Sequence, residues 1–137
     1  MNDVIRITDY GGPGIGGEVS GRGYTILLLN FLPRLKAECI ADMQFHMETD
    51  ESFILLEGSA VLFAAEGKER PGELMAYKLE RGKIFTIPRG IWHTQSMTED
   101  AKILLVESCG TVADNSPRCP IDEAQKEFIR LSSAELL

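Results

Sequence analysis

The sequence of 137 residues has only three cysteines and no long apolar segment. Cys39, Cys109 and Cys119 are widely spaced, which matches neither a disulfide framework nor a Cys-x-x-Cys metal or redox motif. Apolar runs such as residues 26–29 are far too short to cross a bilayer. We therefore expect reduced thiols and no membrane partner. Cys109 at a strand end stays open as a nucleophile, although no histidine lies near it in the sequence.

Basic residues are also scarce, since 14 Lys and Arg stand against 21 Asp and Glu and give a net charge of −7. Nucleic-acid binding depends on Lys and Arg that neutralise phosphates. The charge balance therefore argues against a nucleic-acid partner. Residues 1–8 lack a positive region followed by a continuous apolar segment, so we expect no signal peptide and a cytoplasmic protein.

The overall composition is that of a folded domain, with 44% hydrophobic and 26% charged residues. A chain of this length is close to the size of one typical domain and can bury a proper core. We therefore predict a single domain over residues 1–137.

Residues 24–109 are a succession of short apolar and β-branched runs divided by Gly, Pro and charged turns, which is typical of an antiparallel all-β domain. The predicted strands lie near residues 4–8, 24–32, 43–48, 52–58, 60–65, 74–79, 83–87, 91–97 and 102–109. The turn at residues 57–59 predicts a tight hairpin. Helical spacing of apolar residues predicts a short C-terminal helix over about 121–131, packed on the outside of the barrel or on a partner subunit.

Three glycines within residues 11–23 have the spacing of a dinucleotide-binding fingerprint: Gly12-x-Gly14-x-x-Gly17. That fingerprint works by opening a helix whose N-terminal amides hold pyrophosphate. Here the segment continues toward a strand instead. We predict a flexible loop, which could act as a flap over a pocket.

The only two histidines fall in a pattern that suggests a metal site. Gln44 and His46 lie two residues apart, so they project from the same face of a strand. Glu51 begins the next predicted strand and shares its face with Phe53 and Leu55. A carboxylate buried among apolar neighbours is costly unless a cation lies nearby.

The second histidine follows a compact turn at residues 88–90, where proline fixes φ and glycine permits unusual conformations. His93 then projects from the following strand with Gln95 on its face. If this strand lies beside the one that carries His46, two imidazoles and the Glu51 carboxylate converge as a two-His, one-carboxylate site. A lone strand histidine is more often a hydrogen-bonded core or surface residue, but the three side chains together favour metal binding.

These two stretches resemble the paired motifs of the cupin superfamily. The downstream motif is matched at Gly82, Pro88, Gly90 and His93, and the upstream motif at His46, Glu51 and Gly58. Two positions depart from the family's pattern. Gln44 stands where the family usually has His, and Met97 where it often has Asn.

The resemblance covers residues 44–97 and implies a jelly-roll barrel, or double-stranded β-helix, with a C-terminal helix. It also implies a divalent transition metal, such as Fe, Mn, Ni or Zn, held by His46, Glu51 and His93. Gln44 either ligates the metal or hydrogen-bonds a water or substrate. The residues considered as substrate contacts are Tyr24, Tyr77, Arg89 and Gln95.

The implied function is metal Lewis-acid chemistry on a small polar metabolite, such as a hydroxy acid, keto acid or sugar derivative. Isomerase, lyase and dioxygenase reactions occur on similar folds, so the fold does not choose among them. One alternative is a non-catalytic protein that binds a metal or small ligand. Another is a metal-free barrel that forms a homodimer to cover its strand edges, and a homodimer is expected in either case. Residues 89–93 also resemble cupin-type ureidoglycolate lyases.

Overall fold

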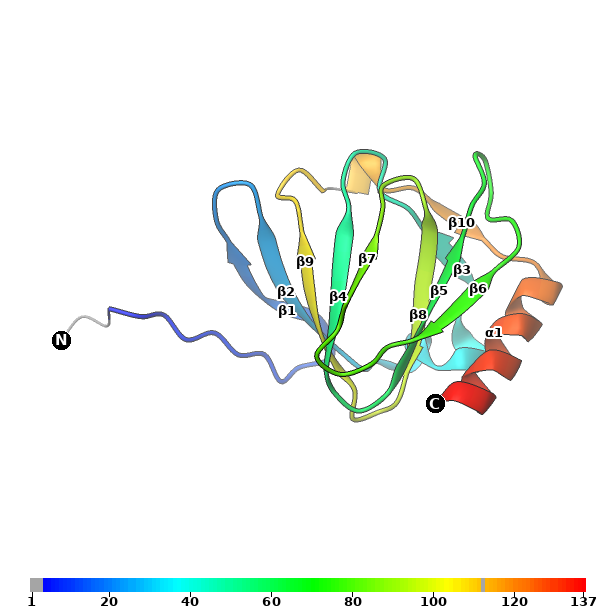
Figure 1. The fold of residues 1–137 in the computed structure, drawn as a ribbon, viewed down its shortest axis with the longest axis horizontal. Coiled ribbons are helices and arrows are strands. Elements are labelled where there is room, and N and C mark those ends of the chain that lie inside the picture. Colours follow the sequence, from blue (N-terminus) through cyan, green and yellow to red (C-terminus); the bar gives the residue numbers. More distant parts are fainter. Residues whose placement is uncertain (1–3, 112) are drawn as a thin grey trace.

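Two five-stranded antiparallel sheets face each other in the computed structural model, which describes residues 4–111 and 113–137 (Figure 1). The first sheet has the order β1-β2-β9-β4-β7, formed by Gly14–Ser20, Thr25–Asn30, Lys102–Glu107, Glu51–Glu57 and Ile84–Ile87. The second has the order β10-β3-β8-β5-β6, formed by Arg118–Pro120, Asp42–Gln44, Trp92–Met97, Ala60–Ala65 and Met75–Lys78. This architecture confirms the predicted all-β jelly-roll class.

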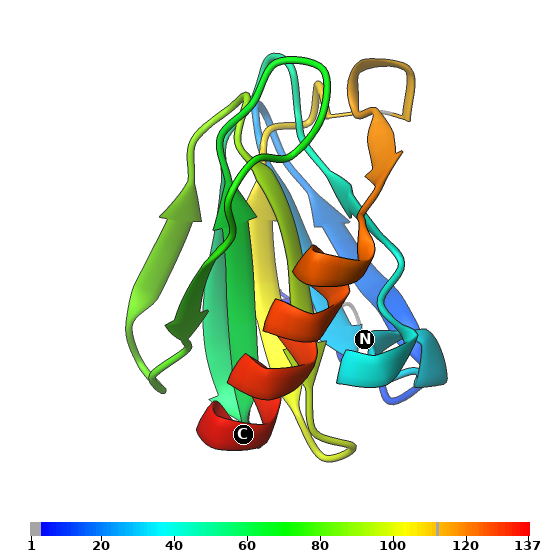
Figure 2. The same ribbon diagram turned by 90° about the vertical axis from the view of Figure 1, so that its right-hand side faces the viewer.

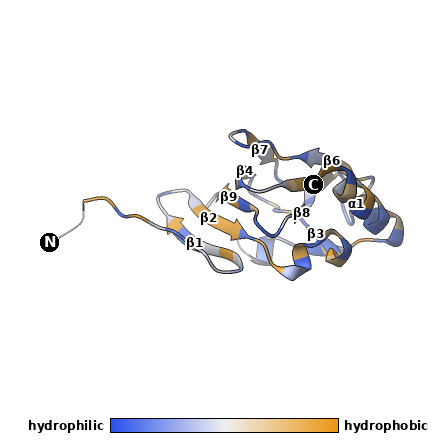
Figure 3. Cartoon of the chain, turned by 90° about the horizontal axis from the view of Figure 1, so that it is seen from below, coloured by the Kyte–Doolittle hydropathy of each residue, from blue (hydrophilic) through white to orange (hydrophobic). Residues whose placement is uncertain are grey.

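The space between the sheets is filled by alternate residues of the strands. Burial alternates along the first five residues of β4, and Phe53 and Leu55 point inward from it. They pack in one cluster with Leu62 of β5 and with Ile103 and Leu105 of β9. Alternation follows from the two-residue period of a strand, whose inner face meets the other sheet. The apolar character of β2, which flanks β9, is visible along its ribbon in Figure 3.

Helix α1, Glu123–Leu136, covers the outer face of the second sheet (Figure 2). Asp122 caps its N-terminus through a capping box with Gln125. Ile129 packs from the helix into a cluster with outward-facing residues of the sheet, including Trp92, which is 2% exposed. The predicted helix was therefore correct in kind, but the observed helix begins two residues later and ends five residues later than predicted. Its packing places Trp92 in a core of this chain.

Two predictions at the N-terminal end were wrong. Residues 4–8 form no strand but run as an extended arm away from the barrel (Figure 1), with Val4 99% and Ile7 93% exposed. The apolar alternation is present, but no described strand lies alongside to pair with it. Conversely, residues 14–20 of the glycine-rich segment form a strand rather than a loop, because β1 pairs with β2 through the backbone and needs no side chains to do so. Its register shifts between Gly16 and Val19, and Gly17 adopts φ +63° there.

The predicted hairpin at residues 57–59 is also wrong, because β4 and β5 belong to different sheets. The turn carries the chain from one sheet to the other. Gly58 has φ +71°, and a Cβ there would lie 2.5 Å from Ala101 Cα, so the corner is too tight for a side chain. The strand predicted near 43–48 ends at Gln44. β10, which pairs with that strand, was not predicted because prolines border it and end it.

Two expectations from the sequence, no membrane-spanning segment and reduced cysteines, can be compared with the described part of the chain. No helix in it is long and apolar enough to cross a membrane. All three cysteines are free, and Cys109 is exposed.

Candidate metal centre

The structure brings His46, Glu51 and His93 together from both sheets. β3 pairs with β8 so that Gln44 lies opposite His93, and His46 follows two residues after the end of β3. Glu51 enters from the first sheet, at the beginning of β4. One ligand atom from each of the three lies within 4.8 Å of the others. The three side chains are buried, because the residues are 7%, 7% and 5% exposed.

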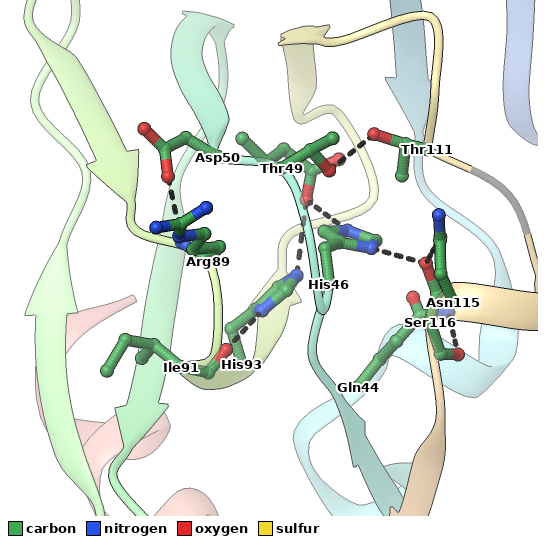
Figure 4. A network of polar contacts seen from close by, with 11 residues as sticks. Gln44, His46, Thr49, Asp50, Arg89, Ile91, His93, Thr111, Asn115 and Ser116 are labelled. Atoms are coloured by element: carbon green, nitrogen blue, oxygen red, sulfur yellow. Dashed lines mark hydrogen bonds and ion pairs between the residues drawn. The ribbon is translucent and has the colours of Figure 1, made fainter.

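The turn at residues 88–90 is tied directly to the other half of the site (Figure 4). The Gly90 amide donates to the His46 carbonyl at 2.9 Å, and the Arg89 amide donates to Asp50 Oδ1 at 2.8 Å. Gly90 adopts φ +78°, the left-handed conformation that glycine reaches without a steric penalty. The turn thus fixes the start of β8, and with it His93, against the corner that carries His46.

His93 is oriented by its own neighbourhood in the sequence. Its Nδ1 lies 3.0 Å from the carbonyl oxygen of Ile91. A carbonyl can only accept a hydrogen bond, so Nδ1 carries the proton. In the neutral ring Nε2 then has a free lone pair, and it lies 3.2 Å from Glu51 Oε1.

His46 is oriented by a residue far away in the sequence. Its Nδ1 lies 2.7 Å from the Ser116 hydroxyl oxygen. That hydroxyl can give its single proton to Asn115 Oδ1 at 3.3 Å, and it then accepts from His46 Nδ1. The Nε2 atom of His46 therefore also presents a lone pair. It is buried, has no hydrogen-bond partner in the described structure and lies 3.4 Å from Glu51 Oε1.

The pKa values of the two carboxyl groups at this end of the cavity, Glu51 and Glu107, are shifted in opposite directions. Burial by itself raises the pKa of Glu51, but in the metal-free protein the His46 and His93 imidazoles, when they carry a proton on Nε2, together with a hydrogen bond from Glu107 outweigh it and hold that pKa well below its usual range. Glu107 lies directly opposite Glu51 on β9. Its burial and its contact with the charged Glu51 raise its pKa to about 8. Glu51 is therefore the anion of the pair, and Glu107 holds a proton.

With both imidazoles neutral, three electron-rich atoms face one another in a buried space: two imidazole Nε2 atoms and one carboxylate oxygen. Without a metal ion or an additional imidazole proton between them, lone pairs and a charge would be buried unpaired, which is costly. Two imidazoles and a carboxylate are a donor set that transition metals bind. The cluster formed by His46, Glu51 and His93 could therefore bind a metal.

Gln44 lies beside this cluster and lines the same cavity. Its amide nitrogen donates to the Ser116 carbonyl oxygen at 3.1 Å. Its Oε1 atom is thus the end of the amide that remains available as an acceptor or ligand. Ser116 contacts both Gln44 and His46, yet sequence reasoning missed it because it lies about 70 residues away in no recognisable motif.

The cluster opens into a cavity of about 440 Å³. Gln95 lines this cavity, as the prediction of a substrate contact requires. Tyr24 and Arg89 line a separate shallow hollow, and Tyr77 is 45% exposed on the edge strand β6. The structure therefore does not bring these three residues into the cavity. Lining residues that sequence reasoning missed include Arg34, Glu107, Thr111, Ser116 and Arg118.

No family model matches the sequence, and no curated protein matches it. Solved structures do match the fold. Pac13, a nucleoside dehydratase, superposes with a TM-score of 0.58 at 11% identity, over 85% of this chain and 88% of its own. Oxalate decarboxylase gives 0.57 at 20% identity, over 82% of this chain but only 30% of its own.

A third similar structure is the hydroquinone 1,2-dioxygenase PnpCD, solved with Cd²⁺. It has a TM-score of 0.52 at 16% identity, over 67% of this chain and 61% of its own. All three structures have the cupin fold, and this chain has a cupin-like fold as well. At these identities the likeness concerns the fold alone.

Proposed function

We propose that this protein holds a divalent transition metal through His46, Glu51 and His93 and acts on a small molecule in the adjoining cavity. One observation carries the proposal. The Nδ1 atom of His93 is bonded to the Ile91 carbonyl, and the Nδ1 atom of His46 is bonded to the Ser116 hydroxyl. Both rings therefore turn their Nε2 atoms toward the same buried oxygen, Oε1 of Glu51. Partners of this kind on the second ring nitrogen are characteristic of metal-binding histidines.

The chemistry that such a metal supplies is Lewis acidity toward an oxygen atom of the substrate, or oxygen activation if the metal is iron. The chain contributes orientation of the ligands. Ser116 fixes the His46 ring, and the backbone of Ile91 fixes the His93 ring. Gln44 Oε1 is placed to hold a water molecule or a donor group of the substrate, because the amide nitrogen is already engaged.

Catalysis rather than passive binding is supported by Glu107, whose carboxyl lies opposite Glu51 and lines the cavity. A carboxyl group at this position can give a proton to a bound molecule or receive one from it. The similar structures are named for dehydration, decarboxylation and ring dioxygenation. We therefore propose a metal-dependent lyase, isomerase or dioxygenase and leave the reaction within this group open.

The decisive experiment measures metal content in untagged protein loaded separately with Mn²⁺, Fe²⁺, Ni²⁺ and Zn²⁺. We expect about one metal ion per chain, and loss of it in His46→Ala and in His93→Ala. Gln95→Ala is the matched control, because Gln95 lines the cavity without belonging to the cluster. Unchanged metal content in both histidine variants would overturn the proposal.

A further inference from the structure

The cavity beside the metal cluster has two kinds of wall. One part is polar and holds His46, Glu51 and His93 with Gln44 beside them, and further polar groups line the cavity as well: Arg34, Asp42, Thr94, Gln95, Glu107, Thr111, Ser116 and Arg118. The other part is aliphatic and comes from β1, β2, β9 and the segment between β2 and β3: Ile15, Leu27, Leu29, Leu35, Ile40 and Leu105. A molecule that fills the cavity therefore meets oxygen- and nitrogen-bearing groups at one part and hydrocarbon at another.

The aliphatic part of this lining is poorly suited to a sugar. Hydroxyl groups placed against leucine and isoleucine would lose their water without gaining hydrogen-bond partners, which weakens binding. Phe53 is the one aromatic residue among those that line the cavity in the described structure, so a sugar ring also finds little aromatic surface. A branched aliphatic body, in contrast, gains from contact with the same wall.

Arg34 supplies the cavity with a positive charge that has no partner. The residue is exposed and lines the cavity, so its side chain lies at the boundary between the cavity and solvent. Within the described residues its side chain forms no hydrogen bond and no ion pair. Arg118, which also lines the cavity, is engaged by Asp42 at 3.2 Å. Arg34 is thus the arginine that remains available for a carboxylate of the ligand.

From this lining we infer that the cavity takes a small anion with an aliphatic body, namely a 2-oxo or 2-hydroxy acid with a branched apolar side chain. The inference rests on the proposed function only in that the adjacent oxygen atoms of the acid coordinate the metal. The aliphatic wall holds the side chain, and Arg34 attracts the negative charge. A cavity of about 440 Å³ is within the usual range for small ligands.

Calorimetric titration with three probes tests this inference on metal-loaded protein. The probes 4-methyl-2-oxopentanoate and pyruvate share the same 2-oxo acid group and differ only in the aliphatic tail. Each buried methylene strengthens binding about fourfold, so we expect the branched acid to bind at least about tenfold more tightly than pyruvate. Ribose, the third probe, is expected to bind most weakly. Equal binding of the two acids, or tighter binding of ribose, would overturn the inference.

Two substitutions with matched controls separate the wall from the charge. Ile15→Asn should reduce the preference for the branched acid, whereas Ile84→Asn should not, because both isoleucines are exposed on edge strands and only Ile15 lines the cavity. Arg34→Gln should weaken the acid about two- to fivefold and leave its methyl ester unaffected. Arg81→Gln is the control, since Arg81 is exposed and lies outside the cavity. An Arg34→Gln variant that binds the acid as well as the parent contradicts the assigned role of Arg34.

The same titrations distinguish failure of the inference from failure of the proposed function. Metal uptake without any preference for the aliphatic tail would overturn the inference and leave the metal site intact. Absence of metal uptake, with the tail preference retained in metal-free protein, would overturn the proposed function and support the substrate class.

Discussion

His93 and His46 turn the same ring nitrogen toward the same carboxylate, but they are held in different ways. The Nδ1 atom of His93 bonds the backbone of Ile91, two residues earlier in the same segment. The Nδ1 atom of His46 bonds the side chain of Ser116, 70 residues later. One histidine is oriented by a local backbone contact, and the other by a side chain that only the folded barrel brings near (Figure 4).

The difference means that the two histidines have unequal vulnerability to mutation. A backbone carbonyl cannot be removed by a side-chain substitution, so the orientation of His93 is lost only if the turn before it is disturbed. The orientation of His46 depends on a single hydroxyl group. Substitutions at these supports therefore measure how far each histidine depends on local and on distant structure.

The largest effect is expected from Glu51→Gln, which removes the carboxylate that both histidines face. Loss of an outer partner of a metal ligand typically reduces metal affinity 10- to 100-fold, so loss of a charged ligand should exceed about 100-fold. Competition with a chromophoric chelator measures this change. A variant that retains the parent's affinity would show that Glu51 is not a ligand.

Next in size is Ser116→Ala, which removes the distant support of His46 and should lower metal affinity about 10-fold or more. Ser116→Thr keeps the hydroxyl and should restore most of the affinity. Ser52→Ala is a matched control, because Ser52 also pairs with another side chain but lies outside the cavity. Co²⁺ spectra distinguish a changed ligand geometry from a general loss of stability. If the spectrum and the affinity are the same in Ser116→Ala as in Ser52→Ala, the distant support is unimportant.

A smaller effect, here on the pH dependence of stability, is expected from Glu107→Gln. This substitution alters the neighbour of Glu51 rather than that of a histidine. The pKa of Glu107 rises from an ordinary 4.5 to about 8, mainly through burial. Folded, metal-free protein therefore binds a proton that the unfolded chain releases between these pH values, and its stability falls as pH rises through this window. Because Glu107 is partly exposed, we expect a loss of only about 1 kcal/mol. Urea denaturation at pH 5 and pH 8 measures the loss.

Glu107→Gln should remove most of that pH dependence, because glutamine does not titrate. Asp122, which caps α1 far from the cavity, provides the comparison in an Asp122→Asn variant. A parent protein whose stability is unchanged or rises between the two pH values would contradict the raised pKa of Glu107.

The smallest effect on the metal is expected from Gly90→Ala, which disturbs the local support of His93. A left-handed conformation costs an alanine about 1 kcal/mol, so urea denaturation should show a loss of that size. Gly82→Ala is matched, since Gly82 also has positive φ and open space at the Cβ position. Both variants should lose similar stability, but only Gly90→Ala should weaken metal binding, by a few-fold. Equal metal affinity in the two variants would show that the turn does not position His93.

The sequence pattern predicted the β-class of the fold, most strand positions and the cluster of His46, Glu51 and His93. Strand periodicity and the turn at residues 88–90 are local properties, and they were sufficient to assign the faces of β4 and β8. The hairpin predicted at residues 57–59 failed because a tight turn can join strands within one sheet or between two sheets. The strand predicted at residues 4–8 failed because alternation indicates a face to be buried without supplying a neighbour.

What the sequence by itself determined is therefore the set of side chains that a strand and a turn present, including His93 after the turn at residues 88–90. What only the tertiary structure decided is which distant groups meet them. Ser116 reaches His46, Glu107 lies opposite Glu51, and Arg34 joins an aliphatic wall in the same cavity. The physical reason is that strand periodicity is short-range, whereas pairing of strands and packing of sheets are set by contacts between residues far apart in the chain.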